Sequence, residues 1–429
     1  MSESLITDVN ALRVWDSRGR PTVEVEIRLA GGAGGRAIAP AGASTGSGEA
    51  LDRRDGGTAF GGLDVTHAVD AVNTIIAPAL TGTDATKQAA VDGVLIELDG
   101  TPDKSRLGGN ATVATSMASA HAGAEAAGLP LWRWLEGPAR PVLPLPEIQI
   151  FGGGAHAGRR VDIQDFMVIA VGAADYTQAL EWTAEVYIAA GKLMADAGKL
   201  AGVADEGGYW PAFDGNEDAL AFLVRAIERA GLTPGEDMAI SLDIAASEFY
   251  SDGRYRLARD DKERDTDGMI EMLQGWVERY PIVSIEDPLA EDDEAGLIAF
   301  TQAVGERVQV VGDDYLVTNA RRVNAGADRG ACNAVLIKPN QAGTLTEARA
   351  ALEASRDAGW GAIVSARSGE SEDVTIVHLA VGWDAKQLKV GSFARSERMA
   401  KWNEGLRIAR ALDSRGELPP RSSFPWNGA

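Results

Sequence analysis

The second two-thirds of the chain repeats one local pattern, a short apolar run that in most cases ends in a charged residue. The runs span residues 238–243, 282–286, 308–313, 334–338, 362–365 and 387–389. After a first gap of 43 residues, from Asp243 to Glu286, the charged ends recur after 27 residues at Asp313 and after 25 residues at Lys338. A strand, a helix and two loops need about this length in an eightfold barrel of ~250 residues. The pattern therefore predicts a β/α barrel or another α/β fold.

The segments between these runs have helical periodicity, and the first third of the chain is built differently. Residues 344–359 place Leu345, Ala348, Ala351 and Leu352 at helical spacing. Residues 22–29 alternate like a half-buried strand, and Ala-rich helical patterns follow from about 66 to 135. The stretch 137–146 holds four prolines, which disfavour regular structure. We expect an N-terminal α+β domain over 1–138, a barrel over 139–429, and a loose tail from residue 419.

The net charge and the cysteine content limit the binding partners and the cellular compartment that we expect for this chain. Lys and Arg number 41 against 63 Asp and Glu, a net charge of −22, which disfavours non-specific binding to nucleic acid polymers or anionic membranes. Cys332 is the only cysteine, so the chain has no intramolecular disulfide and is compatible with a reducing compartment. The N-terminus has no signal-peptide pattern, and no run approaches bilayer length. We expect a cytoplasmic protein.

The charged strand ends form the candidate site, because active sites of such barrels lie at the carboxyl ends of the strands. Asp243, Glu286 and Asp313 would give three carboxylates around one point, which suits Mg²⁺. The alternative for each acid is a helix cap or a pair with arginine. Lys338 would reach the same rim, where cations and Lys389 would lower its pKa and let it act as a base; the alternative is a salt-bridged rim lysine.

Two further residues carry weaker signals. Glu206 precedes two glycines in Asp205-Glu-Gly-Gly208, which would let the backbone approach a ligand. His156 lies in a glycine-rich loop, residues 152–158, that could close over a substrate. A lone histidine is more often a surface residue than a catalyst.

Taken together, a series of motifs resembles the enolase family, in order and with near-constant spacing from about Val9 to Ile408. The motifs are Asp16-Ser-Arg-Gly, Gly42-Ala-Ser-Thr-Gly46, Gly154-Ala-His-Ala157, Asp205-Glu-Gly-Gly208, Ser284-Ile-Glu-Asp-Pro288, Gly312-Asp-Asp314, Leu336-Ile-Lys338 with Asn340-Gln341, Arg367-Ser-Gly-Glu370 and Arg395-Ser-Glu-Arg398. The resemblance implies an N-terminal α+β capping domain over the mouth of a β/α barrel. It also implies two Mg²⁺ ions, a 2-phosphoglycerate or phosphoenolpyruvate substrate, and a homodimer or higher homo-oligomer.

The resemblance also implies a role for each matching residue. For the metal ions it implies the ligands Asp243, Glu286, Asp313 and Ser44. For catalysis it implies the base Lys338 and an acid side made of Glu206, Asp165 and the mobile-loop His156. For substrate binding it implies Gln164, Glu286, Lys389 on the carboxylate, and Arg367 and Ser368 on the phosphate. Two dications on the carboxylate would stabilise the charge of an enolate.

Several positions depart from the family pattern. Ala366 replaces a pocket histidine, Asp165 shortens a glutamate, and Gly152 replaces an asparagine, all on the acid side. These three changes remove side-chain volume, whereas Trp210 adds it. His378 stands where the family has aspartate. The metal site and the lysine base are unchanged.

The departures favour a specialised reaction over an ordinary one. Our interpretation is an enzyme like carboxyphosphonoenolpyruvate synthase of phosphinate natural-product biosynthesis, whose enlarged acid side would take a nucleotide-activated phosphonoformate as second substrate. The alternative is an ordinary phosphopyruvate hydratase that converts 2-phosphoglycerate to phosphoenolpyruvate and water. A non-catalytic enolase-like binding protein is a remote alternative, because a costly cluster of buried charges would then have no purpose.

Overall fold

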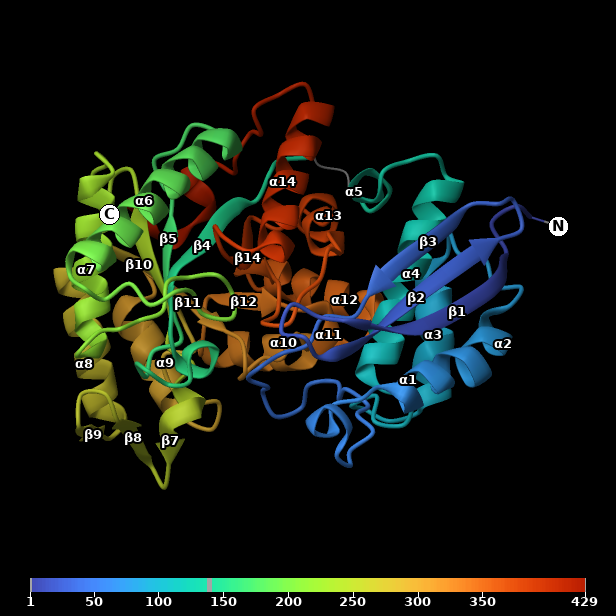
Figure 1. Ribbon diagram of the computed structural model, residues 1–429, viewed down its shortest axis with the longest axis horizontal. Helices are drawn as coiled ribbons and strands as arrows, with labels where there is room; N and C mark the ends of the chain where they lie inside the picture. The colour runs from blue at the N-terminus through green and yellow to red at the C-terminus, as the bar shows by residue number, and fades with distance from the viewer. Residues whose placement is uncertain (1, 137–140, 429) are drawn as a thin grey trace.

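A computed structural model describes residues 2–136 and 141–428 of the chain. Figure 1 shows two parts side by side, an N-terminal part at the right and a larger barrel at the centre and left. The predicted boundary between residues 138 and 139 lies outside the described residues.

The N-terminal part is an antiparallel sheet covered by helices. Strands β1 (Ile6–Trp15), β2 (Pro21–Leu29) and β3 (Gly34–Ile38) are hydrogen-bonded in that order. Helix α4 (Gly109–Ala126) packs on β2 and β3, and its many Ala, Gly and Ser residues allow the close approach that buries almost the whole helix. The remaining elements are η1 (Ala59–Gly62), α1 (Thr66–Ala71), η2 (Val72–Ile76), α2 (Ala77–Leu80), α3 (Gln88–Asp99) and α5 (Leu131–Trp134). The strand and helices expected here are confirmed.

The described residues after 141 contain a closed eight-stranded barrel, which confirms the predicted fold class. Its strands are, in spatial order, β4 (Leu145–Gly152), β5 (Asp165–Ile169), β6 (Ala239–Asp243), β10 (Ile282–Glu286), β11 (Gln309–Gly312), β12 (Ala334–Ile337), β13 (Gly361–Ser365) and β14 (Gln387–Ser392). All neighbours pair in parallel except β5, which runs antiparallel to both β4 and β6. The six predicted runs correspond to β6 and β10–β14. The first two strands were not predicted.

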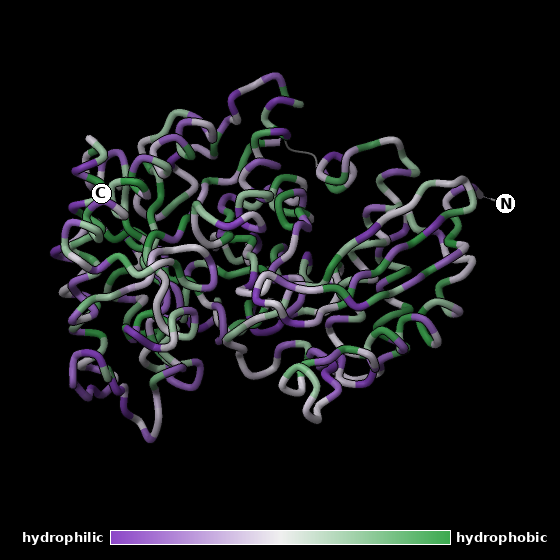
Figure 2. Tube along the Cα trace, in the orientation of Figure 1, coloured by the Kyte–Doolittle hydropathy of each residue, from purple (hydrophilic) through white to green (hydrophobic). Residues whose placement is uncertain are grey.

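Helices surround the barrel, and short elements decorate its loops (Figure 1). The helices are α6 (Tyr176–Asp196), α7 (Asn216–Arg229), α8 (Thr266–Arg279), α9 (Glu294–Val304), α10 (Ala320–Arg329), α11 (Pro339–Ala342), α12 (Leu345–Asp357), α13 (Thr375–Gly382) and α14 (Ser396–Ala411). The short elements are η3 (Gly154–Ala157), η4 (Ala246–Phe249), β7 (Tyr250–Ser251), β8 (Arg254–Leu257) and β9 (Lys262–Arg264). Figure 2 shows hydrophilic residues gathered on the β7–β9 sheet at the lower left.

The C-terminal segment is packed, so the prediction of a loose tail is wrong. After η5 (Arg421–Ser423), Phe424 stacks on Trp426 of η6 (Pro425–Gly428), and both rings are buried. Their cluster includes Leu145, Ile169 and Ala239, which lie at the end of the barrel opposite the carboxyl ends of its parallel strands. Burial of these two rings outweighs the irregular backbone that the prolines impose.

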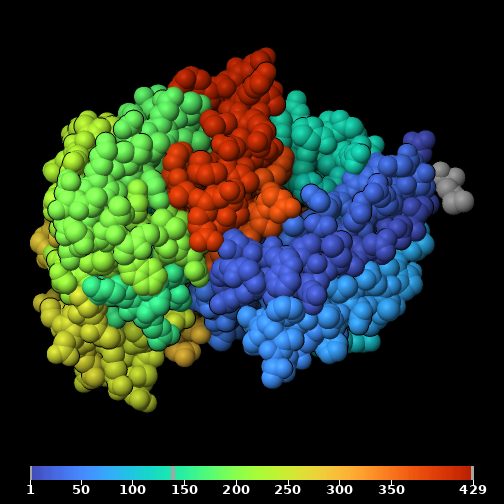
Figure 3. Space-filling view, viewed as in Figure 1, coloured from blue at the N-terminus to red at the C-terminus, as the bar shows by residue number. Residues whose placement is uncertain are grey.

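The N-terminal part packs against the barrel, as the space-filling view shows for its blue surface beside the orange and red one (Figure 3). Backbone bonds join Ser17 to Glu370 and Ala41 to Gly369. Within the described ranges, no helix is both long and apolar enough to cross a membrane.

Candidate active site

The candidate site lies where the carboxyl ends of the barrel strands meet a loop of the N-terminal part. One small cavity, of about 20 Å³, is lined by all the predicted site residues except Glu286 and Asp313, which lie behind two lysines. Because about 10–15 Å³ of such space holds one water molecule, the cavity has room for little more than one water beside these side chains. A larger hollow of about 620 Å³ lies elsewhere, beside α7, α8 and β9, and is lined by charges of both signs.

Buried carboxylates alternate with buried lysines at the strand ends. Lys389 on β14 donates to Asp243 Oδ2 at 3.0 Å and to Glu286 Oε2 at 2.6 Å. Lys338, which follows β12, donates to Asp313 Oδ2. Burial and the neighbouring charges of Asp243 and Asp313 raise the pKa of Glu286 well above its ordinary value. The three predicted metal ligands thus lie in one buried network whose direct contacts run through Lys389 and Lys338, and their role as metal ligands stays a prediction.

Lys338 is surrounded by charged groups in this arrangement. Burial is the largest influence and would lower the pKa of Lys338, but Asp313 and Glu286 together outweigh it and raise the pKa. The lowering of this pKa by bound cations stays a prediction. The prediction for Lys338 took nearby cations into account but not the carboxylate of Asp313, with which it pairs. Asp313 responds in the opposite direction: despite burial, Lys338 and then Arg367 lower its pKa.

The donor chemistry of these residues fits a hard dication. Glu286 Oε1 is buried and has no hydrogen-bond partner among the described residues, so a ligand oxygen is free. Asp243, Glu286 and Asp313 do not bring three ligand atoms within 4.8 Å of one another. Among the described residues, two groups do: Asp287 with Asp313 and Asp314, and His156 with Asp165 and Glu206. Asp287 accepts hydrogen bonds from the backbone N–H groups of Asp313 and Asp314 at 2.8 and 3.0 Å. Its carboxylate therefore stabilises the backbone at Asp313 and Asp314.

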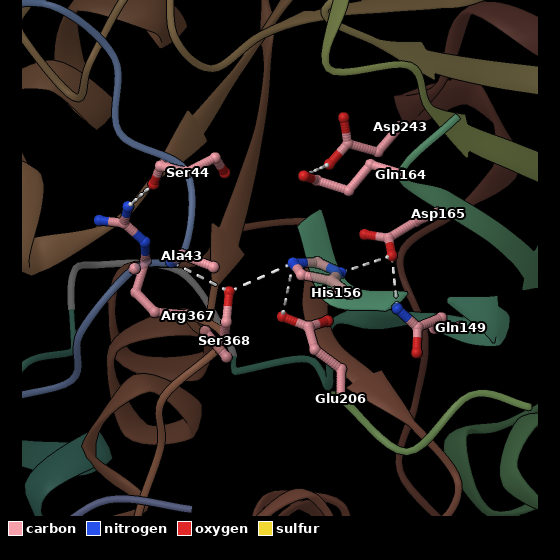
Figure 4. A network of polar contacts seen from close by, with 12 residues as sticks. Ala43, Ser44, Gln149, His156, Gln164, Asp165, Glu206, Asp243, Arg367 and Ser368 are labelled. Carbon is pink, nitrogen blue, oxygen red and sulfur yellow. Dashed lines mark hydrogen bonds and ion pairs between the residues drawn. The ribbon is translucent and has the colours of Figure 1, made fainter. Parts of the chain in front are cut away.

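The acid side is a network around the loop histidine (Figure 4). His156 Nδ1 lies 3.2 Å from Asp165 Oδ1, and its Nε2 lies 3.2 Å from Ser368 Oγ and 3.8 Å from Glu206 Oε1. Burial would lower the pKa of His156, but Glu206 and Asp165 outweigh it and raise the pKa to about 9. In turn, His156 lowers the pKa of Asp165 although burial would raise it. The structure thus joins His156, Asp165 and Glu206 in one buried cluster.

The N-terminal part completes the anion-binding side. Arg367 donates to Glu49 Oε2 at 3.0 Å and to the backbone oxygen of Ser44 at 2.9 Å. Ser368 Oγ accepts the N–H of Ala43 at 3.3 Å. The guanidinium of Arg367 lies so close to Gly42 that a Cβ there would come within 2.1 Å of it, which is why this loop needs glycine. Gln164, on the other side, donates to Asp243 Oδ2 at 3.0 Å.

Sequence reasoning missed several polar residues of the site. Gln341 donates to both Asp313 and Glu49, and buried Arg398 holds the backbone oxygens of Arg367 and Ser368. Gln149 bridges Asp165 and Gly208. A polar residue inside the apolar run 145–151 was a usable signal for Gln149, whereas nothing local distinguishes Glu49.

The expected enlargement of the acid side is not seen as open space. Ala366 and Asp165 line the cavity of about 20 Å³, and His156 and Glu206 line it too. At Gly152, a Cβ would lie 2.8 Å from the Cβ of Ala204 and 3.1 Å from the side-chain oxygen of Gln149. At Gly152, neighbouring side chains therefore occupy the space that a larger residue would take, whereas Ala366 and Asp165 border the cavity.

Comparison with known proteins matches both parts of the chain. Residues 6–135 match the family described as "Enolase, N-terminal domain", and residues 140–423 match "Enolase, C-terminal TIM barrel domain". Enolase 1 of Desulfitobacterium hafniense (strain Y51) is 50% identical over 426 residues, which cover 99% of this chain and 98% of that protein.

Proposed function

Because the chain belongs to the enolase family, we propose that this enzyme converts 2-phosphoglycerate to phosphoenolpyruvate and water. One observation carries the proposal: a buried lysine and a buried acid cluster face the same small cavity. Lys338 lines one side, and Glu206 with His156 lines another. Removal of a proton from C2 and loss of hydroxide from C3 need two such groups.

The base half forms the enolate. Lys338 Nζ takes the C2 proton, and the electron pair moves into the substrate carboxylate. Lys389, whose pKa the surrounding carboxylates raise well above its ordinary value despite burial, keeps a positive charge beside that carboxylate. Asp243, Glu286, Asp313 and Ser44 would hold Mg²⁺, which would supply positive charge to stabilise the enolate and to offset the effect of Asp313 on the pKa of Lys338.

The acid half expels the hydroxyl group. The C2–C3 double bond forms as the C3–O bond breaks, and the departing hydroxide takes a proton from the cluster of Glu206 and His156, so that water leaves. Arg367 and Ser368 bind the phosphate and hold C2 and C3 in place. Asp165 accepts from His156 Nδ1 and thereby fixes the ring.

A second candidate is the specialised reaction that forms carboxyphosphonoenolpyruvate, with a nucleotide-activated phosphonoformate as co-substrate. The observation that favours it is the pair Ala366 and Asp165, where the resemblance implies histidine and glutamate. The similarity to an enolase over 99% of the chain favours the ordinary reaction.

An ultraviolet assay of phosphoenolpyruvate formation with Mg²⁺ separates the two candidates. The proposed hydratase gives an ordinary enzyme rate. A specialised enzyme gives a rate lower by about 10²-fold or more, the scale of one lost acid–base contribution. The double variant Ala366→His, Asp165→Glu should then gain dehydration activity and lose any reaction with the bulkier co-substrate.

We also propose a cytoplasmic homodimer, following the family resemblance. Leu12 and Trp15 on β1 are exposed by 47% and 50%, and Phe60 lies against Trp15, which gives the N-terminal part an apolar surface. Light scattering on the purified protein tests the dimer; a monomer mass at micromolar concentration would reject it.

A further inference from the structure

Gln149 lies inside the barrel and joins two elements of the acid side. Its side chain is fully buried on β4. The amide nitrogen donates to Asp165 Oδ1, and the amide oxygen accepts the backbone N–H of Gly208 at 2.9 Å. Figure 4 shows Gln149 and His156 converging on the same oxygen of Asp165. The side-chain amide of Gln149 therefore fixes the distance between the carboxylate of Asp165 and the backbone at Gly208.

The backbone segment held by Gln149 is the turn that presents Glu206. Ala204 donates its N–H to the oxygen of Gly208 at 2.7 Å, and Gly207 donates to the oxygen of Ala204 at 3.0 Å. Glu206 lies at the tip of this turn, and Gly208 lies at its base. A shift of Gly208 would therefore move Glu206 relative to His156.

Two glycines provide the space that the amide occupies. A Cβ on Gly208 would lie 2.4 Å from Gln149 Oε1, and a Cβ on Gly152 would lie 3.1 Å from the same oxygen. The first distance excludes any side chain, and the second would force the amide to move. The backbone on both sides is thus shaped around Gln149.

The chemistry of an amide sets the direction of the hydrogen bonds. Gln149 Nε2 can only donate, so Asp165 Oδ1 must accept from it. The same oxygen then accepts from His156 Nδ1–H, which leaves His156 Nε2 facing Ser368 and Glu206. A glutamate at position 149 could accept from Gly208 but would repel Asp165.

We propose that Gln149 is a positioning residue of the acid half, which holds Asp165, His156 and the Glu206 turn in a fixed relative geometry. The inference rests on the proposed function only for its kinetic consequence. Among the described residues Gln149 has no hydrogen bond to Lys338 or Lys389, and it binds Asp165 Oδ1, whereas Asp165 Oδ2 is the oxygen that lies 3.5 Å from Lys389 Nζ. We therefore expect it to act mainly on the step that expels hydroxide.

The substitution Gln149→Met tests this, because methionine keeps the length and apolar volume and loses both hydrogen bonds. We expect kcat for dehydration of 2-phosphoglycerate to fall by about 10- to 100-fold, the cost of a misplaced catalytic group. KM should stay within about threefold. Exchange of the C2 hydrogen with D₂O, followed by NMR, should also stay within about threefold. Equal losses in exchange and dehydration, or no loss in either, would overturn the proposal.

Gln309→Met is the matched control. Gln309 is also buried inside the barrel and donates to Gln387 Oε1 at 2.8 Å, but it lies at the start of β11, at the end away from the site. Its replacement should lower thermal stability as Gln149→Met does, and the ratio of exchange to dehydration should be unchanged.

A second readout does not depend on activity. The chain has four histidines, so ¹⁵N-histidine labelling gives few signals, and His156→Gln assigns the one of interest. In Gln149→Met the imidazole nitrogen signals of His156 should shift, while those of His67, His121 and His378 stay in place. Unshifted His156 signals would reject the positioning role. An unmodified protein that neither exchanges nor dehydrates 2-phosphoglycerate would instead reject the proposed function, and the His156 signals would still decide the role of Gln149.

Discussion

At the scale of single residues, the site is a balance of buried charges. Each of three buried carboxylates accepts a hydrogen bond from one of two buried lysines. Because a buried charge without a partner costs several kcal/mol, removal of any one group changes the others. Functional tests at these positions therefore need controls that are equally buried.

Lys338→Ala should stop exchange of the C2 hydrogen of 2-phosphoglycerate, with a loss of at least about 100-fold, because it removes the proposed base from the cavity wall. NMR in D₂O measures the exchange. Lys104→Ala is the control, since Lys104 is also buried and pairs with Glu347 at 2.9 Å outside the site. Continued exchange in the Lys338 variant would place the base elsewhere.

Asp313→Asn should weaken Mg²⁺ binding by at least about 10-fold, because ligand removal costs no less than removal of a supporting group. Isothermal calorimetry on the purified protein measures this affinity. Asp92→Asn provides the comparison: Asp92 is fully buried and accepts from Ser116 at 2.6 Å and Thr346 at 2.9 Å, away from the site. Equal Mg²⁺ affinities in all three proteins would remove Asp313 from the ligand set.

At the scale of elements, the direction of a strand determines whether a site residue could be predicted from the sequence pattern. In the parallel strands the charged residue ends an apolar run, so Asp243, Glu286 and Lys338 were predicted from pattern alone. Strand β5 runs the other way, and Asp165 is its first residue. An acid at the start of a strand has no such pattern, and Asp165 was reached only through the family resemblance.

Strand β4, the other strand that was not predicted, begins within the proline-rich stretch that we interpreted as a connector. Pro146 is the second residue of β4, where the proline-rich stretch runs directly into the barrel. Side-chain partners were also outside the reach of the sequence. The pairing of Lys338 with Asp313, and of Arg367 with Glu49 over 318 positions, depends on tertiary packing.

Helix α13 carries a histidine that should make the protein sensitive to acid. His378 lies beside Glu404 on α14, His121 on α4 and Asp373 before α13. Burial, with a smaller contribution from His121, lowers the pKa of His378 to about 4, although Glu404 at 3.5 Å opposes this. Burial outweighs that contact, and Nδ1 has no partner among the described residues.

The sign of the effect follows from proton uptake. Below pH 6.5 the unfolded chain protonates His378 and the folded protein does not, so stability falls as the pH drops from about 6.5 to about 4, by on the order of 3 kcal/mol. Denaturant titrations across this range should show the loss, and His378→Gln should reduce it. His67→Gln, at an exposed position, should not. Identical pH profiles for all three proteins would contradict the assignment.

At the scale of the whole molecule, each end of the barrel is closed by a different part of the chain. The N-terminal part brings Ser44 and Glu49 to the catalytic end. The C-terminal segment seals the opposite end with Phe424 and Trp426. The residues that pack the C-terminal segment therefore lie at the end of the barrel that is opposite the candidate active site.

Trp426→Ala should destabilise the protein by about 3 kcal/mol, since it empties a packed aromatic site. Thermal and denaturant unfolding measure the loss, and kcat at low temperature should not change. Leu200→Ala, at a position exposed by 51%, should cost less than about 0.5 kcal/mol. A Trp426 variant as stable as the parent would show that the tail is not part of the core.

The reversed direction of β5 also bears on how this scaffold can be redesigned. Both ends of the segment between Gly152 and Asp165 emerge at the catalytic mouth, because β4 arrives there and β5 departs from there. A replacement segment of another length would leave the barrel's hydrogen-bond register intact while rebuilding the wall opposite Lys338. Libraries that keep His156 and vary the other residues of 153–163 are therefore the natural starting point for directed evolution toward bulkier substrates.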